Sequence, residues 1–350
     1  MIINDLPEIY KNLLPSIFHK TAISETLSTC DNCAMLCSSK KPSKEESKAE
    51  FNQTFKCCTY HPDIPNFLVG GILYDMTDEI TDGKQRIIKA IESKISSRPN
   101  GVYAPNNYVA MYSSGDAFGH ADSMGCPFYN KQNSNCSIWK YRDSVCSTWF
   151  CKYQQNDLGQ IFWNDVEEYL AEIQSNLVDY ILIQLGFSTA SIMTFKQHGH
   201  LGFRHKILTS EEQDSLPMSE EDYNKTWGTW AGREIELYKS SYDIVANMSK
   251  STLRSINGVE SEFYENKIQS SYLNKNMLPP ILKLNTLKKS NVRPFKKEGL
   301  DFIEISLFND ENAKHLPVKV QFPASLVEKF NGTKPWSDVI NNSSFAPRSI

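Results

Sequence analysis

The sequence predicts a mainly α-helical protein with irregular, cysteine-rich metal-binding loops and a small α+β appendix at its C-terminal end. Apolar residues recur at spacings of three and four over several stretches, as they do on the buried face of a helix. Alternating apolar and polar residues after position 300 predict strands instead. All nine cysteines lie within the first 151 of the 350 residues, so the thiols are concentrated in one part of the chain.

The helical period is found in stretches that are predicted to form helices: residues 3–18, 83–97, about 163–186 and 230–248. The acidic residues Asp165, Glu167 and Glu168 are expected on the solvated face of the longest one, in its N-terminal turn. A buried turn leading into a helix is expected at 65–73. Residues 101–123 are rich in Gly, Asn, Ser and Tyr and are expected to be irregular.

The chain changes character at Leu278-Pro279-Pro280. The predicted parts are a cysteine-cluster domain with covering helices over 1–277, a basic and polar linker over 278–299, and a small α+β domain over 300–350. Strands are expected at 302–308 and 318–322, followed by a helix from Ser325.

The segment around Phe330-Asn331-Gly332-Thr333 resembles the strand–helix element of small winged-helix-like recognition domains. This resemblance implies a protein or peptide partner for the C-terminal domain. A plain structural cap is the alternative.

Bulk composition excludes several classes of function. A net charge of −4 and a pI near 6.0 give no argument for nucleic acid or an anionic membrane as partner. No apolar run approaches the roughly 20 residues that a membrane span requires. The N-terminus has no basic region followed by a long apolar one, so no signal peptide is expected. We therefore expect a cytoplasmic protein, where clustered thiols bind metal more often than they form disulfides.

The thiols form two groups along the sequence. The nine candidate metal ligands are Cys30, Cys33, Cys37, Cys57 and Cys58 in the first group, and Cys126, Cys136, Cys146 and Cys151 in the second. Thiolates favour zinc and iron–sulfur clusters, and each of these takes four cysteines, so nine suffice for two sites with one to spare. Structural zinc usually comes with paired CxxC knuckles, and only Cys30-x2-Cys33 has that form, which favours iron–sulfur.

The second group has characteristic flanks: Cys126-Pro127-Phe128-Tyr129, Cys136-Ser137-Ile138-Trp139, Arg142-Asp143-Ser144-Val145-Cys146 and Trp149-Phe150-Cys151. Together with the upstream thiols, residues 30–153 resemble the YkgJ-type zinc- or iron-chelating cysteine-cluster family. The chain departs from that pattern in the charged insert before Cys57-Cys58 and in Asp143, where proline is common.

The resemblance implies a cluster-binding protein, with one or two [4Fe–4S] clusters. Some relatives, such as the flagellin lysine-N-methylases, couple the cysteine cluster to methyl transfer from S-adenosylmethionine. The short stretch Leu68-Val69-Gly70-Gly71 does not amount to a nucleotide fingerprint, so a methylase is the lesser alternative.

Other side chains are candidates for supporting roles. His198, His200 and His205 either ligate a metal or belong to a solvated basic loop. His61 and His120 are better placed as auxiliary ligands or as hydrogen-bond donors to ligands, with an ordinary hydrogen-bonded loop residue as the alternative for each.

Arg142 either neutralises an anionic cluster or forms a surface ion pair. Trp227, Trp230 and Arg233 form a pocket wall or, as the alternative, pack as aromatic residues of a helix.

These observations lead to two main hypotheses. The first is an iron–sulfur protein with redox or modification chemistry. The second is a zinc-stabilised binding or adaptor protein that presents the C-terminal domain to a partner. No residue is identified as catalytic, because no Ser-His-Asp or Cys-His motif is present.

Overall fold

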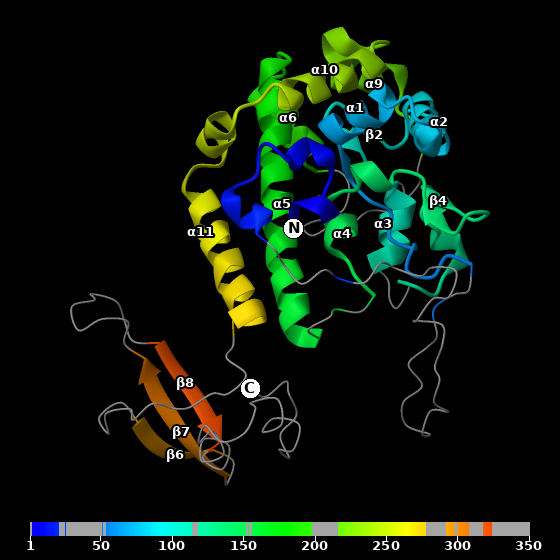
Figure 1. The fold of residues 1–350 in the computed structure, drawn as a ribbon. Helices are drawn as coiled ribbons and strands as arrows, with labels where there is room; N and C mark the ends of the chain where they lie inside the picture. Colours follow the sequence, from blue (N-terminus) through cyan, green and yellow to red (C-terminus); the bar gives the residue numbers. More distant parts are fainter. Residues whose placement is uncertain are drawn as a thin grey trace. The chain divides into compact units, whose positions relative to one another are not determined.

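The computed structural model describes residues 2–20, 25, 51, 54–113, 118–151, 153, 156–197, 216–277, 292–297, 300–307 and 318–323. The chain divides into two compact units, Met1–Tyr272 and Leu273–Ile350. The described part is mainly helical, as the sequence predicts (Figure 1). Among these residues, no helix is both long enough and apolar enough to cross a membrane.

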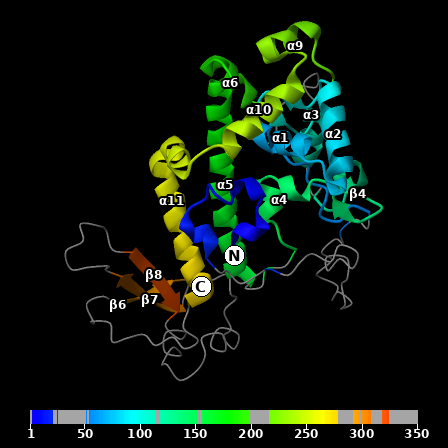
Figure 2. The ribbon, with the colours of Figure 1, turned by 45° about the horizontal axis from the view of Figure 1, so that its top comes forward.

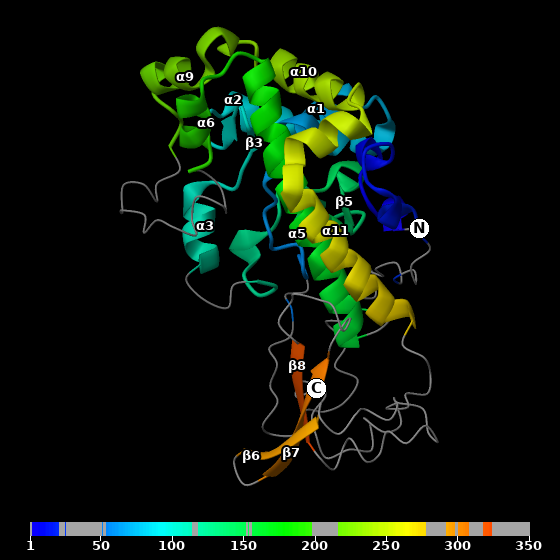
Figure 3. The same cartoon turned by 90° about the vertical axis from the view of Figure 1, so that its left-hand side faces the viewer.

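The first unit is built around the long helix α5 (Asn156–Gln184), which contains the helix predicted at about 163–186. Its apolar stripe is buried, including Phe162, Val166, Leu170 and Ile181. Helix α11 (Lys250–Met277) lies alongside it (Figure 3), and the rings of Phe162 and Tyr272 are 6.3 Å apart between centroids.

Helices α1 (Asn66–Tyr74) and α10 (Glu234–Ala246) cross at one end of α5 (Figures 1 and 2). The crossing is close because α1 presents Gly70 to α10. A Cβ atom at Gly70 would lie 2.0 Å from the carbonyl oxygen of Tyr238. The predictions of a buried turn entering a helix at 65–73 and of a helix near 230–248 are both confirmed.

The remaining elements of the first unit are short. The α-helices are α2 (Thr81–Glu92), α3 (Asn106–Ser113), α4 (Ser144–Thr148), α6 (Thr189–Phe195) and α9 (Glu220–Trp227). The strands β1 (Ile64–Pro65), β3 (Gly101–Val102) and β2 (Ser97–Arg98) form an antiparallel sheet in that order, and β4 (Tyr129–Asn130) pairs with β5 (Asn135–Cys136). The 3-10 turns are η1 (Ile2–Asp5), η2 (Glu8–Tyr10), η3 (Ser16–His19), η5 (Asp78–Ile80), η6 (Asp122–Met124), η7 (Trp139–Tyr141) and η8 (Gly228–Trp230).

Several sequence predictions differ from the structure. The single helix expected at 3–18 is three 3-10 turns, because Pro7 and Pro15 precede η2 and η3 and cannot continue a helical hydrogen-bond ladder. Helix α2 ends at Glu92, since Lys94 adopts a positive φ of 56°. The region 101–123, expected to be irregular, contains α3 and η6.

The prediction of a solvated acidic turn at the start of the long helix is wrong for Asp165. Helix α5 begins nine residues earlier in the chain, at Asn156, so Asp165 lies in its interior. Its side chain is buried and pairs with Lys267 of α11 at 3.1 Å. A buried carboxylate is retained because it is paired.

The described residues of the second unit form an antiparallel sheet in the order β6 (Val292–Lys297), β7 (Leu300–Leu307) and β8 (Val318–Pro323). Strands β7 and β8 confirm the predicted strands. Strand β6 falls within the predicted linker at 278–299. Its composition, rich in Lys, Arg and Pro, does not predict a strand, and pairing with β7 stabilises it. The helix predicted from Ser325 and the winged-helix-like segment lie outside the described residues.

Candidate metal centre

The second cysteine group sits on a β-hairpin and a short helix. Cys126 precedes β4 and Cys136 ends β5, while Cys146 lies in α4. The hairpin is closed by Ser137, whose N–H and hydroxyl both donate to the carbonyl of Phe128, at 2.9 and 2.8 Å.

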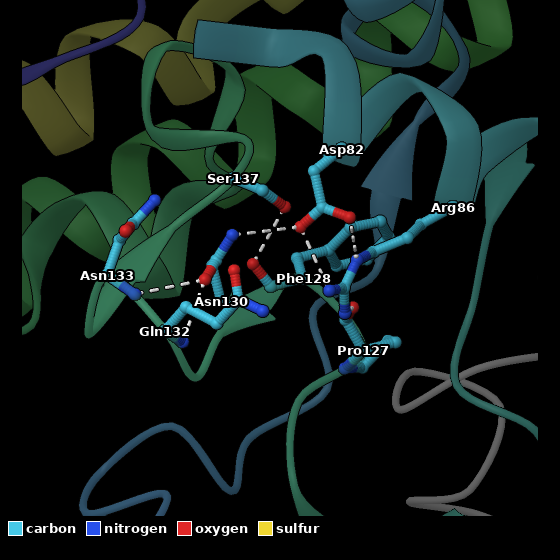
Figure 4. A network of polar contacts seen from close by, with 8 residues as sticks. All are labelled: Asp82, Arg86, Pro127, Phe128, Asn130, Gln132, Asn133 and Ser137. Atoms are coloured by element: carbon cyan, nitrogen blue, oxygen red, sulfur yellow. Dashed lines mark hydrogen bonds and ion pairs between the residues drawn. The ribbon is translucent and has the colours of Figure 1, made fainter.

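Helix α2 holds this hairpin in place (Figure 4). Arg86 forms a two-point ion pair with Asp82, both contacts at 2.9 Å, and donates to the carbonyl of Pro127. The Asn130 amide lies 3.5 Å from Asp82. The backbone that carries Cys126 and Cys136 is therefore attached to a regular helix.

The thiols of Cys126 and Cys136 face backbone N–H groups. Burial raises the pKa of the Cys126 thiol to about 12, while the backbone N–H groups of Phe128 and Tyr129 lower it, and the N–H of Tyr129 donates to the carbonyl of Cys126 at 3.1 Å. Burial also raises the pKa of Cys136, and the N–H of Ile138 lowers it. N–H groups that point at sulfur stabilise a thiolate, the form that binds metal.

Cys146 completes a set of three thiols. Burial raises the pKa of its thiol well above the usual range, and the nearby Asp143, Cys126 and Cys136 raise it further. Arg142 has the opposite effect, because its positive charge lowers the pKa of Cys136. Each cysteine is only partly exposed. The three sulfurs are therefore electrostatic neighbours, and each belongs to a partly buried residue.

Arg142 and Asp143 are fixed beside these thiols. Arg142 donates to the carbonyls of Trp139 and Cys146, at 3.0 and 2.9 Å, and its guanidinium lies 3.5 Å from the centre of the Trp139 ring. Asp143 is buried and caps α4 by accepting the N–H of Cys146 at 2.8 Å. Burial raises the pKa of Asp143 to about 7, and its hydrogen bonds with Cys146 lower it.

The segment with Cys57 and Cys58 lies against the second group. The N–H of Cys126 donates to the carbonyl of Cys58 at 2.8 Å. The next residue, Thr59, is fully buried; its hydroxyl accepts from Gly119 at 2.6 Å and its carbonyl from the hydroxyl of Tyr108. The structure thus brings the backbone of Cys58 beside that of Cys126, although the sequence assigns the two residues to separate groups.

Cys151 lies in different surroundings. Burial raises the pKa of Tyr153, and the charges of Glu25 and Cys151 raise it further. Glu25 accepts from the indole of Trp163 at 2.9 Å, and the Phe150 ring lies 4.7 Å from that of Trp163. This end of the group is therefore attached to the start of α5.

The histidines predicted as candidate ligands lie in different places. His61 is buried beside the centre: its N–H donates to Tyr108 at 2.8 Å, and its ring lies 6.1 Å from that of Phe128. His120 lies 5.7 Å from the Phe51 ring. Other predicted candidates lie outside the described residues: Cys30, Cys33, Cys37, His198, His200 and His205.

The aromatic segment near 230 is a separate region. Trp227 is fully buried and packs edge-on against Tyr238 at 5.9 Å, as the helix-packing alternative expects. Arg233 pairs with Glu236 at 2.8 Å and borders an open pocket of about 460 Å³.

The sequence pattern assigns no functional role to two residues of this region, Asp143 and Tyr108. Asp143 had a signal, because an aspartate three residues before Cys146 is a typical N-cap. Tyr108 had none, since its hydroxyl reaches Thr59 across 49 residues of chain.

Three partly exposed thiols, backbone N–H groups and an arginine are neighbours in this region. Among the described residues, no three His, Cys, Asp or Glu side chains are gathered around one point as ligands of a single ion. Comparisons with protein-family models, curated proteins and solved structures gave no match.

Proposed function

We propose that this protein is an iron–sulfur protein that binds a [4Fe–4S] cluster through cysteines of its first unit. The observation that carries the proposal is that three partly buried thiols, those of Cys126, Cys136 and Cys146, are electrostatic neighbours. Burial and mutual repulsion make these thiols costly to ionise on their own. A bound cation or cluster offsets that cost, since ligation deprotonates a thiol outright.

The surroundings of the thiols support the same proposal. The backbone N–H groups of Phe128 and Ile138 lower the pKa values of Cys126 and Cys136 and would share the negative charge of bound thiolates. Arg142 adds a positive charge that its bonds to two backbone carbonyls hold in place. Hydrogen bonds and charges of this kind tune the reduction potential of a cluster.

When bound, the cluster would supply one-electron redox chemistry or an exchangeable iron site for a modification reaction. The chain's own residues bind it, exclude water and set the local charge. The resemblance of residues 30–153 to YkgJ-type cysteine-cluster proteins adds to the support for this proposal. A zinc-stabilised binding protein is the competing outcome of the same experiment.

Anaerobic purification tests the proposal directly. We expect a brown protein with broad absorbance near ~400 nm and about four irons per cluster. Iron, acid-labile sulfide and zinc are measured on the same sample. A colourless protein with stoichiometric zinc and no sulfide would contradict the proposal.

Single serine variants then identify the ligands. Cys126→Ser, Cys136→Ser and Cys146→Ser should each lose the absorbance and lower the melting temperature, because metal-linked folding energy is lost. Thr148→Ser is the matched control: Thr148 is also buried in α4, and serine keeps the hydroxyl that donates to Ser144 at 2.9 Å. Its metal content should equal that of the wild type. If one of the cysteine variants keeps full metal content, that residue is not a ligand.

A further inference from the structure

We propose that Arg98 and Tyr103 form a binding site for the carboxylate group of a small molecule. Arg98 ends strand β2, and Tyr103 directly follows strand β3, which pairs with β2 in a tight hairpin. The proposed site uses none of the cysteines, so it does not depend on the proposed cluster.

The two side chains lie on the same face of this hairpin. In its antiparallel register Ser97 is opposite Val102, and both are buried. The N–H of Tyr103 donates to the carbonyl of Ser96 at 2.8 Å, which continues the register by one pair. Because side chains alternate along a strand, Arg98 and Tyr103 point away from the buried face.

Hydrogen bonds from two helices hold the backbone of the hairpin. The N–H and the side-chain amide of Asn66, at the start of α1, donate to the carbonyls of Asn100 and Pro99, at 3.0 and 3.1 Å. The hydroxyl of Tyr238 in α10 donates to the carbonyl of Arg98 at 2.7 Å. A side chain on a fixed backbone has less freedom to lose on binding, so Arg98 is preorganised for a ligand.

The side chain of Arg98 is half-buried. Among the residues that the structure describes, no group forms an ion pair or a hydrogen bond with its guanidinium. Burial lowers the pKa of Arg98, whereas Tyr103 and Tyr238 raise it. Buried charges in proteins are normally paired, since an uncompensated charge is costly. An anion from solution would be such a partner.

Tyr103 adds a hydrogen-bond donor beside the guanidinium. Its ring is half-buried, and within the described ranges its hydroxyl makes no hydrogen bond. Burial raises the pKa of this hydroxyl, Asp63 raises it further, and the charge of Arg98 lowers it, so Tyr103 and Arg98 are electrostatic neighbours. The phenol therefore stays protonated and can donate to an anion that the guanidinium binds.

The charges around the pair favour a carboxylate over a phosphate. Asp63 and Asp179 both raise the pKa of Tyr103, so negative charge is already near its hydroxyl. Only Asp179 is offset by a printed ion pair of its own, with Lys196 at 2.5 Å. A phosphate monoester carries about −1.5 to −2 at pH 7 and is repelled more strongly than a singly charged carboxylate. The two oxygens of a carboxylate also match the planar fork of arginine.

Calorimetry on the full-length protein tests the proposal with acetate, lactate and succinate as probes, each compared with sodium chloride at equal ionic strength. At ten times the Kd of the tightest probe, the melting temperature should rise by about 3 °C. Arg98→Met should abolish this saturable rise. Tyr103→Phe should weaken binding about tenfold, because a hydrogen bond to a charged group is lost. If the wild type responds to all three probes no more than Arg98→Met does, there is no such site.

Arg254→Met is the matched control, since Arg254 is exposed and pairs with Glu262 at 3.1 Å. It should bind the probes as the wild type does. In chloride alone, Arg98→Met should melt no lower than the wild type, because it removes an unpaired charge. A lower melting temperature, or failure to fold, would mean that the guanidinium is paired within the protein, and the proposal is then wrong. Arg98→Lys keeps the charge without the fork and should fold but bind about tenfold more weakly; wild-type affinity in this variant also counts against the site.

Inorganic phosphate separates the two kinds of anion. It should bind more weakly than the tightest carboxylate, and tighter binding that Arg98→Met abolishes would overturn the choice of a carboxylate. Iron and zinc are measured on every sample and should be the same in Arg98→Met as in the wild type. A wild type that binds a carboxylate but no metal contradicts the proposed cluster alone, whereas a metal-loaded wild type that binds no carboxylate contradicts this site alone.

Discussion

Asp143 is the residue whose charge most directly affects the thiols. It is buried, caps α4, and raises the pKa of Cys146. Asparagine keeps the capping oxygen and removes the charge. In metal-free protein we therefore expect Asp143→Asn to lower the pKa of Cys146 and to speed its alkylation by iodoacetamide at pH about 8, near the ordinary cysteine pKa. Labelling is followed peptide by peptide in mass spectra.

The control for this prediction is Asp157→Asn, an exposed aspartate in the first turn of α5. It should leave the labelling of Cys146 unchanged. Asp143→Ala should speed labelling in the same way but also lower the free energy of unfolding by about 1 kcal/mol, because the cap is lost. Unchanged labelling in Asp143→Asn would show that this carboxylate does not face the thiol.

The same carboxyl gives a pH dependence of stability. Its pKa in the folded protein is about 7, above its usual value of 3.8, so the folded state binds this proton more tightly than the unfolded state does. Stability from this group is complete below pH about 4 and is lost as the pH rises through about 7. Urea unfolding of metal-free protein between these limits should show that fall in the wild type and a smaller one in Asp143→Asn.

Residue identities were enough to predict the thiols as candidates, because their types and spacings carry the chemistry. Their assignment to sites was not predictable in this way, since it depends on which segments meet. The bonds from Tyr108 to Thr59 and from Cys126 to Cys58 join distant parts of the chain. No local pattern in the sequence records such pairings.

At the scale of elements, the crossing of α1 and α10 depends on Gly70. Alanine is the better helix former by about 1 kcal/mol, so an unhindered Gly→Ala change would stabilise α1. Here the added Cβ would lie 2.0 Å from the Tyr238 carbonyl, which belongs to rigid backbone. We expect Gly70→Ala to lower the free energy of unfolding by about 2 kcal/mol or more, as overpacking of a core does.

Urea unfolding followed by circular dichroism measures this effect. Ser240→Ala in α10 is the matched control, because Ser240 is only partly buried and its change adds no atoms. The control should stay within about 0.5 kcal/mol of the wild type, as surface changes usually do. A Gly70→Ala variant that is more stable than wild type would mean that the two helices separate without cost.

The sequence predicts a helix correctly where the apolar period runs over many turns. It fails where a single residue sets the end of a helix or prevents its formation. The apolar stripe of α5 runs through many turns, and the helix was predicted from it. The turns at residues 2–19 depend on two prolines, and the end of α2 depends on the positive φ of Lys94. Helix α11 carries a break at Gly258, with φ 58° and ψ −144°, and no prediction was made for it.

At the scale of the whole molecule, the fold class was predictable because it follows from composition and period summed over many residues. Strand β6 was not, since its stability comes from pairing with β7 and not from an apolar pattern of its own. The candidate centre is partly predictable from the sequence. Its ligand types come from the sequence, whereas its hydrogen bonds and charges come from tertiary structure.

The core of the first unit is rich in buried tyrosines, and this gives the molecule a distinct response to alkali. Burial raises the pKa values of several of them: Tyr10, Tyr103, Tyr108, Tyr169 and Tyr238. The hydroxyl of Tyr238 in α10 donates to the carbonyls of Arg98 and Gly101, at 2.7 and 3.1 Å. These bonds attach α10 to the backbone at Arg98 and Gly101.

The folded state therefore keeps these phenolic protons at a pH where the unfolded chain, with an ordinary tyrosine pKa of about 10, releases them. Stability from each is present below pH about 10 and is lost as the pH rises through the raised folded-state pKa. We expect fewer than the 16 tyrosines of the native protein to ionise before it unfolds.

Near-ultraviolet absorbance counts the ionised rings, while circular dichroism reports whether the protein is still folded. In concentrated urea all should titrate together near pH 10, and Tyr238→Phe should reduce the slope of stability against alkaline pH. Titration of every tyrosine near pH 10 in a protein that is still folded would contradict the burial of these rings.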